Sequence, residues 1–164
     1  MHSENWEIFS SIPHKSQVAI LRSVGRGAQA EVFEGVFSGK QCAVKKYFFT
    51  NLNEVGLDFF LREAAILRKL QGCPNIIHCY GIILEPKDHD NGFDLSLVLD
   101  WIDAGTLRRF CSKHSGGVVG GTITEQLALS ILCDVAGGLV RCHEAGVAHL
   151  DIKVKPNHCV LSRL

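Results

Sequence analysis

Two groups of residues near the start of this chain could together hold a ligand that carries phosphates. Gly25 and Gly27 lie in a Gly-x-Gly-x-x-Ala run, and Lys45 ends the apolar segment Cys42-Ala43-Val44-Lys45. Glycines let the backbone approach phosphates closely, because a side chain there would occupy the space of the ligand. A lysine supplies a positive charge, although a single lysine at a strand end is most often a solvated surface residue.

The glycine run alone does not identify the ligand. It is compatible with a plain turn, with a dinucleotide-binding turn and with a hairpin that covers phosphates. A dinucleotide-binding turn must open a helix, whereas here Glu31–Phe37 ends at Ser38-Gly39-Lys40 and leads into Gln41–Tyr47. The apolar residues of Glu31–Phe37 also fit a helical period, and Gly35, the β-branched content and the following turn favour two strands joined by a tight turn.

In the hairpin interpretation, three apolar residues form a roof over a planar base. These residues are Val24, Val32 and Ala43. Strand side chains alternate between the two faces of a sheet, so Lys46 is expected to point away from the face that carries Lys45.

Glu63 is the expected partner of Lys45. It lies in the segment 54–70, where apolar residues recur at steps of three and four and predict an amphipathic helix: Leu57, Leu61, Ala64, Leu67 and Leu70. A carboxylate on such a helix is usually a solvated charge. However, a lysine aimed at phosphates must be held in one rotamer, and a partly buried ion pair from the adjoining helix does so.

The remaining pattern predicts strands in the first part of the chain and helices in the second. After a lead-in over 1–16, strands are expected within 17–47 and at 76–84 and 95–101, with a short helix after Gly105 and a long helix from Thr122 to about Glu144. Gly116–Gly121 predicts a loop, and Thr122-Ile123-Thr124-Glu125 predicts a capping box with Thr122 as the cap. The long helix is apolar around nearly its whole circumference, so it would have to be buried on all sides. The chain supplies too few partners for that, which predicts uncovered apolar side chains and a chain that is marginally stable or prone to aggregation.

Composition argues against several classes of protein. The chain has 17 Lys and Arg against 17 Asp and Glu, so it shows no broad charge for nucleic acid or an anionic membrane. Its seven cysteines form no Cys-x-x-Cys pair, which favours a reducing compartment. The first residues carry no apolar run for secretion, and His2 stands where myristoylation needs glycine. A cytoplasmic location, with access to the nucleus, is expected.

Taken in order, these residues resemble the amino-terminal part of a eukaryotic protein kinase catalytic domain, of the serine/threonine or tyrosine-kinase-like group, from about residue 17 to 153. The matching positions are Gly25, Gly27 and Val32 in the glycine-rich loop, Lys45 as the phosphate-binding lysine, Glu63 as its helix partner, Leu99 at the gatekeeper position, Asp100, Trp101 and Ile102 in the hinge, and His149 and Asp151 in the catalytic loop. The resemblance implies an α+β fold: a five-stranded antiparallel small lobe with one helix over 17–100, then the start of a large lobe over 101–164.

The resemblance also implies ATP binding, with the hinge backbone hydrogen-bonding adenine, and it assigns roles in phosphoryl transfer. Asp151 would accept the proton of a substrate hydroxyl, and Lys153 would steady the transferred group, a pattern similar to serine/threonine kinases. Leu150 replaces the usual arginine, so control through a phosphorylated activation loop docking there is not expected. Asn157 is the candidate magnesium ligand, one place later than the family pattern has it.

The expected function is therefore that of an ATP-dependent protein kinase that transfers the γ-phosphate to a serine or threonine of a protein substrate, with Mg²⁺ as cofactor. The 164 residues contain no Asp-Phe-Gly, the triplet that holds magnesium in this family, so this chain alone is expected to be inactive. The alternative is a non-catalytic kinase-like protein that acts by binding nucleotide or by pairing with another kinase. A dinucleotide-binding enzyme is disfavoured by the strand that follows the glycine turn.

Overall fold

The computed structural model describes residues 15–48, 54–86, 93–103, 105–114 and 123–148. The chain divides into two compact units. Unit 1 comprises Met1–Arg68 and His78–Trp101, and unit 2 comprises Lys69–Ile77 and Ile102–Leu164. The division of the chain into a small lobe and the start of a large lobe stays a prediction.

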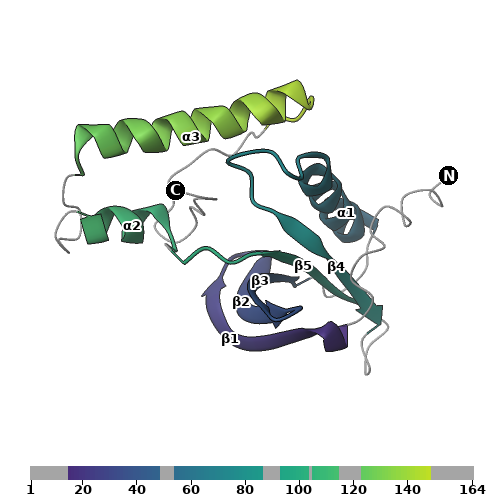
Figure 1. The fold of residues 1–164 in the computed structure, drawn as a ribbon. Coiled ribbons are helices and arrows are strands. Elements are labelled where there is room, and N and C mark those ends of the chain that lie inside the picture. The colour runs from purple at the N-terminus through teal and green to yellow at the C-terminus, as the bar shows by residue number, and fades with distance from the viewer. Residues whose placement is uncertain (1–14, 49–53, 87–92, 104, 115–122, 149–164) are drawn as a thin grey trace. The chain divides into compact units, whose positions relative to one another are not determined.

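Unit 1 is built on the predicted five-stranded antiparallel sheet (Figure 1). Its strands are β1 (Val18–Arg26), β2 (Ala30–Phe37), β3 (Lys40–Tyr47), β4 (Cys79–Pro86) and β5 (Phe93–Asp100), in the spatial order β1-β2-β3-β5-β4. A short 3₁₀ turn, Lys15–Gln17, precedes them. The predicted meander over 17–47 is thus confirmed as three antiparallel strands, with β2 in the place where a helix was the competing interpretation.

Local backbone chemistry explains the two turns of this meander. Ser38 and Gly39 have φ angles of 49° and 75°, and two successive positive φ values are what a tight type I′ hairpin between β2 and β3 requires. Between β1 and β2, the amide of Gly27 donates to the carbonyl of Ala30 at 2.8 Å and closes the glycine-rich turn.

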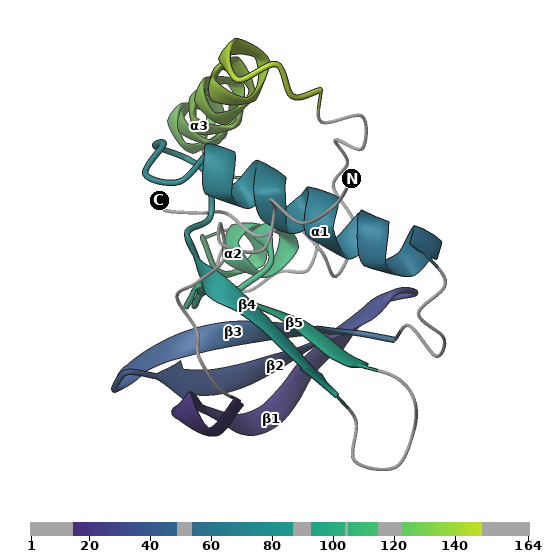
Figure 2. The same ribbon diagram turned by 90° about the vertical axis from the view of Figure 1, so that its right-hand side faces the viewer.

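Helix α1 (Glu54–Lys69) confirms the predicted amphipathic helix and belongs to unit 1 as far as Arg68. Figure 2 shows it lying over one face of the sheet. Phe60 and Ala64, one helical turn apart, are buried on its inner side. The ring of Phe60 meets the ring of Tyr47 on β3 edge to face, with 5.3 Å between ring centroids. This contact fixes α1 on the face of the sheet to which Tyr47 points.

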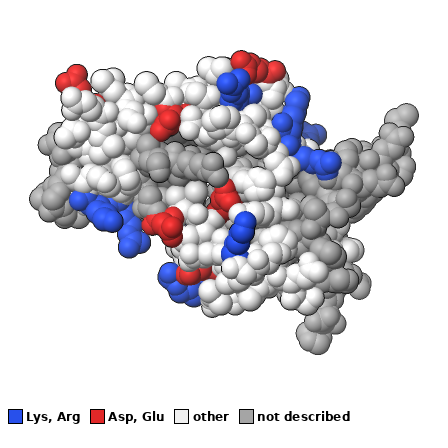
Figure 3. Space-filling view, viewed as in Figure 1, with Lys and Arg blue, Asp and Glu red and all other residues white. Residues whose placement is uncertain are grey.

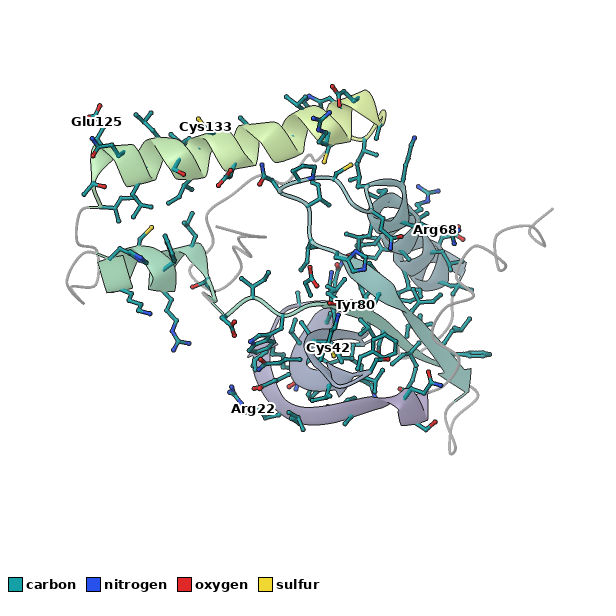
Figure 4. The ribbon with its side chains drawn as sticks, viewed as in Figure 1. Arg22, Cys42, Arg68, Tyr80, Glu125 and Cys133 are labelled. Atoms are coloured by element: carbon teal, nitrogen blue, oxygen red, sulfur yellow. The ribbon has the colours of Figure 1, made fainter. Side chains whose placement is uncertain are left out.

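The sheet buries apolar residues on both faces. On the face opposite α1, a core cluster consists of Val18, Cys42, Val44, Ile83 and Val98, with Phe33, Phe37 and Tyr80 packed against it. Figure 4 labels Cys42 and Tyr80 among these side chains. On the α1 face, β5 contributes Leu95, Leu97 and Leu99, all buried. The interior strand β5 is therefore buried on both sides, and its segment Leu95–Leu99 is apolar except for the buried Ser96.

Strand β4 begins at Cys79 rather than at Ile76, where the sequence predicted it. The intervening residues form a turn: Asn75 has a φ of 62°, and the amide of Ile76 donates to the carbonyl of Cys73. Gly72, with a φ of 77°, follows the end of α1. A left-handed glycine is a common stop for a helix, and here it leads the chain into the turn instead of directly into a strand.

Unit 2 contains this turn together with α2 (Leu107–His114) and α3 (Glu125–Glu144). The predicted capping box of α3 is wrong. The cap is Thr124, whose hydroxyl oxygen accepts from the amide of Leu127 at 3.2 Å, so Glu125 is the first helical residue and cannot reach back from the third position. Thr122 and the predicted glycine loop 116–121 lie outside the described residues.

The prediction that this chain supplies too few partners to bury α3 on all sides is confirmed for the described residues. Ile131, Gly138 and Cys142 are buried, whereas several large apolar side chains are exposed: Leu129, Leu132, Val135 and Val140. Figure 4 shows Cys133 on the side of α3 that faces away from α2. The buried face is the one that carries Gly137 and Gly138 against Asn75. None of the helices in the described ranges is long and apolar enough to cross a membrane.

Candidate functional site

Strand pairing gathers the predicted ligand-binding residues on one face of the unit 1 sheet. Gly25 lies opposite Val32, Val32 lies opposite Lys45, and Lys45 lies opposite Leu97, so these four residues form one row across four strands. In the next row, Ala43 lies opposite Leu99. Directly opposed residues of antiparallel strands share a face. The alternation within each strand therefore brings together residues from widely separated parts of the sequence.

The predicted ion pair between Lys45 and Glu63 is present. Lys45 Nζ lies 2.6 Å from Glu63 Oε1, and each side chain is 29% exposed. The pair joins the middle of β3 to the middle of α1, and partial burial protects it from full screening by solvent. The lysine is thus held on the α1 face, in the same row as Gly25 and Val32.

Tyr47 is a third member of this cluster that the sequence analysis did not anticipate. Its hydroxyl donates a hydrogen bond to Glu63 Oε2, and its ring centroid lies 4.9 Å from Lys45 Nζ. Burial, with the nearby negative charge of Glu63 as a second cause, raises the pKa of Tyr47 far above its ordinary value. The hydroxyl therefore stays protonated and acts as a donor. Its position two residues after Lys45, on the same strand face, is a signal that could have revealed it.

Lys46, the neighbour of Lys45, points to the opposite face as predicted. Its Nζ lies 3.1 Å from Asp94 Oδ1, on the face that carries Val44 and Val98. Two adjacent lysines of one strand thus have separate carboxylate partners on separate faces of the sheet.

The glycine-rich turn leaves open space at Gly25. A Cβ atom placed on Gly25 would meet nothing within 4 Å, so packing within the described protein does not require a glycine there. The turn is tied to the end of β3, since the amide of Phe48 donates to the carbonyl of Gln29, and the Arg26 guanidinium lies 4.5 Å from the centroid of the Phe48 ring. These contacts hold the turn in place while one of its glycines faces open space.

Val24 is less well placed than the other roof residues. It lies at an irregularity in the pairing of β1 with β2, between Ser23 and Gly25, and is 41% exposed. Val32 and Ala43 share the Lys45 face by register, whereas a contact of Val24 with them stays a prediction.

At the end of β5 the main chain is already partly engaged. Leu99 is buried, and the amide of Asp100 donates to the carbonyl of His78 at 3.0 Å. The carboxylate of Asp100 accepts a hydrogen bond from the hydroxyl of Tyr80. The carbonyl of Ile102 accepts from the amide of Gly105. A ligand that hydrogen-bonds to the main chain after Leu99 therefore has to use groups that are not already bonded. The amide of Asp100 is not among them, because it donates to His78.

Residues 18–157 of the chain match the sequence model of the protein kinase domain family. The chain belongs to the protein kinase family. It is 31% identical to a probable serine/threonine-protein kinase of Dictyostelium discoideum over 139 residues, which are 85% of this chain and 8% of that protein. It is 27% identical to a probable serine/threonine-protein kinase of Arabidopsis thaliana over 143 residues, 86% of this chain and 13% of the relative.

A serine/threonine-protein kinase of Schizosaccharomyces pombe is 29% identical over 145 residues, which are 84% of this chain and 29% of that protein. The chain thus spans less than a third of the length of these three kinases. The matched range agrees with the resemblance seen in the sequence, and the observed sheet with its helix is the fold expected for the small lobe of a kinase.

The residues predicted for the catalytic loop lie outside the described structure. These are His149, Asp151, Lys153 and the metal candidate Asn157. The described chain ends just before them, after α3 closes with a left-handed Gly146 and a bond from the amide of Val147 to the carbonyl of Cys142. Within the ranges that the structure describes, no group of three His, Cys, Asp or Glu could hold a metal.

Three other features of the described residues are a hollow in unit 2, the surface charges and the cysteines. An open hollow of about 440 Å³ lies in unit 2 between residues 69–74 and the end of α3, and no predicted site residue lines it. On the face shown in Figure 3, acidic and basic side chains of the described residues are interspersed. The six described cysteines are free thiols, and burial raises the pKa of Cys79 to about 11.

Proposed function

We propose that this chain binds ATP on the α1 face of the unit 1 sheet, as part of a serine/threonine protein kinase. The observation that carries the proposal is the partly buried Lys45–Glu63 pair, which lies in the same strand row as Gly25 and Val32. A surface lysine would not need a carboxylate from a second element to hold it. A lysine that meets phosphates does need one, because its charge must stay at one position.

The residues of the row and their neighbours have distinct roles in this proposal. Lys45 presents its ammonium group to the phosphates, and Glu63 fixes its rotamer. Gly25 and Gly27 let the backbone approach the same phosphates, and the open space at Gly25 is what such an approach needs. Val32 supplies apolar surface to the adenine.

Leu99 and the main chain that follows it complete the nucleotide site in this proposal. Leu99 lies opposite Ala43 and, together with it, bounds the base. The main chain from Asp100 to Ile102 hydrogen-bonds the adenine edge through groups other than the amide of Asp100, which His78 already engages.

Transfer of the phosphoryl group is assigned to the catalytic loop. Asp151 accepts the proton of a serine or threonine hydroxyl on a protein substrate, and Lys153 steadies the transferred group. This part is supported by the family and by the serine/threonine kinases among the relatives. Mg²⁺, when bound, would neutralise charge on the phosphates. Asn157 is the residue of this chain that would help to hold it.

The second candidate function is a non-catalytic kinase-like protein that binds nucleotide or pairs with a complete kinase. It is favoured by one observation, the position of Asn157 one place later than the family pattern has it. The two candidates differ in their use of magnesium. A working metal site makes ATP binding depend strongly on Mg²⁺, whereas binding through Lys45 and the glycine turn alone is nearly independent of it.

The test is a calorimetric titration of the chain with ATP, with and without Mg²⁺. Lys45→Ala is compared with the matched control Lys46→Ala, which removes the same charge from the other face of β3. We expect Lys45→Ala to weaken binding by about tenfold or more, since a charge-assisted hydrogen bond contributes about 1.5–3 kcal/mol. Lys46→Ala should change affinity by about twofold at most. Equal affinities for the wild-type chain and Lys45→Ala would contradict the proposal.

A further inference from the structure

The Glu63 carboxylate is held by β3 through both of its oxygens. Oε1 meets the ammonium group of Lys45 at 2.6 Å, and Oε2 accepts from the hydroxyl of Tyr47. Lys45 and Tyr47 are two residues apart on one strand and therefore project from the same face. A carboxylate with a single lysine partner can rotate about its side-chain bonds toward solvent, whereas two donors spaced along a strand define its plane.

Tyr47 is itself fixed independently of Glu63. It is 5% exposed, and its ring packs edge to face on Phe60, which projects from α1 one turn before Glu63. The ring also lies beneath the ammonium group of Lys45, 4.9 Å from Nζ. The tyrosine therefore contacts the helix at two points, one apolar and one polar, and contacts the lysine by its aromatic face.

We propose that Tyr47 is a positioning residue of the Lys45–Glu63 pair: its hydroxyl keeps Glu63 turned toward β3 and so holds Lys45 in place before any nucleotide binds. That the positioned lysine binds ATP rests on the function proposed above. That Tyr47 positions the pair does not, because the contacts described here lie within the sheet and α1. The described contacts of the helix glutamate with Lys45 and Tyr47 all lie within unit 1.

The substitution Tyr47→Phe isolates the role of the hydroxyl. Phenylalanine keeps the ring against Phe60 and under Lys45 and removes the hydroxyl that bonds to Glu63. Tyr80→Phe is the matched control, because it removes a second tyrosine hydroxyl that donates to a carboxylate, that of Asp100, on the opposite face of the same sheet. The two variants lose the same type of bond, and one of them leaves the Lys45 cluster intact.

The measurement is NMR of the chain with ¹³Cε-labelled lysine, without nucleotide, with the Lys45 signal assigned from Lys45→Ala. In the wild-type chain and in Tyr80→Phe, the two Hε protons of Lys45 should be inequivalent and shifted by the Tyr47 ring. In Tyr47→Phe, we expect the inequivalence to fall by about half or more as the lysine samples several rotamers. A Lys45 signal in Tyr47→Phe that keeps the wild-type inequivalence would overturn the proposal.

ATP titration of the same variants separates this proposal from the proposed function. If the Lys45 signal changes in Tyr47→Phe and Lys45→Ala still binds ATP like the wild-type chain, Tyr47 positions the pair but the pair does not bind ATP. If the Lys45 signal does not change, the role of Tyr47 is wrong whatever the affinity for ATP.

Discussion

The two long helices of this chain use their apolar residues in different ways. In unit 1, α1 buries Phe60 and Ala64 and is tied to β3 by both oxygens of Glu63. In unit 2, α3 is richer in apolar residues, yet it buries Ile131 and Cys142 and leaves Leu132 62% exposed. The difference shows that burial follows from the partners a helix meets rather than from its own hydrophobicity. It also shows that polar contacts can define the place of the less apolar helix.

The largest expected effect is on the packing of α1. Phe60→Ala removes a fully buried ring that contacts Tyr47, and we expect a loss of about 3–5 kcal/mol in the free energy of unfolding. Urea unfolding followed by circular dichroism measures it. Phe60→Leu is the control, because it conserves most of the volume and should cost about 1–1.5 kcal/mol. A loss below about 1 kcal/mol for the alanine variant would show that α1 is not anchored through this ring.

Neighbouring residues of α3 sharpen the comparison within one helix. Ile131→Ala should cost about 2–4 kcal/mol, because the side chain is buried, whereas Leu132→Ala should change stability by about 0.5 kcal/mol at most. Parallel urea titrations of the two variants provide the measurement. Equal losses would mean that the outer face of α3 is covered in solution and that the contrast with α1 is smaller than the structure shows.

The smallest expected change in stability concerns the start of α3. Thr124→Ala removes the cap on the amide of Leu127 and should cost about 1 kcal/mol. Thr122→Ser keeps the hydroxyl of the residue first expected to be the cap and should be neutral. Thr122→Ala is expected to be neutral as well. If Thr122→Ala lowered the stability and Thr124→Ala did not, Thr122 would be the cap and the structure would be wrong at this point.

Much of unit 1 could be predicted because its signals agree with one another. Alternation in β3 separates Lys45 from Lys46, Ser38-Gly39 supports a tight turn, and the three-and-four spacing defines α1. The same alternation places Tyr47 on the face of Lys45. The spacing of two residues from Lys45 therefore also predicts that Tyr47 lies near Glu63.

Two local predictions failed because the sequence fits more than one structure there. Ile76 and Ile77 have the β-branched side chains of a strand, but a turn with the left-handed Asn75 precedes β4, and Ile76 lies against Gly138. Thr122 and Thr124 are both good caps, and only the position of the first helical turn decides between them. The incomplete burial of α3 was predicted, but which of its residues are covered depends on its neighbours in space.

The most direct test of the central claim is to ask which lysine of the chain a nucleotide contacts. An adenosine analogue with a sulfonyl fluoride in place of the phosphates forms a sulfonamide with a nearby lysine amine and releases fluoride. Mass spectrometry of the digested protein then locates the label. The account predicts labelling of Lys45 and its suppression by excess ATP. Labelling of Lys46 or Lys69 instead, or labelling of Lys45 that ATP does not reduce, would contradict it.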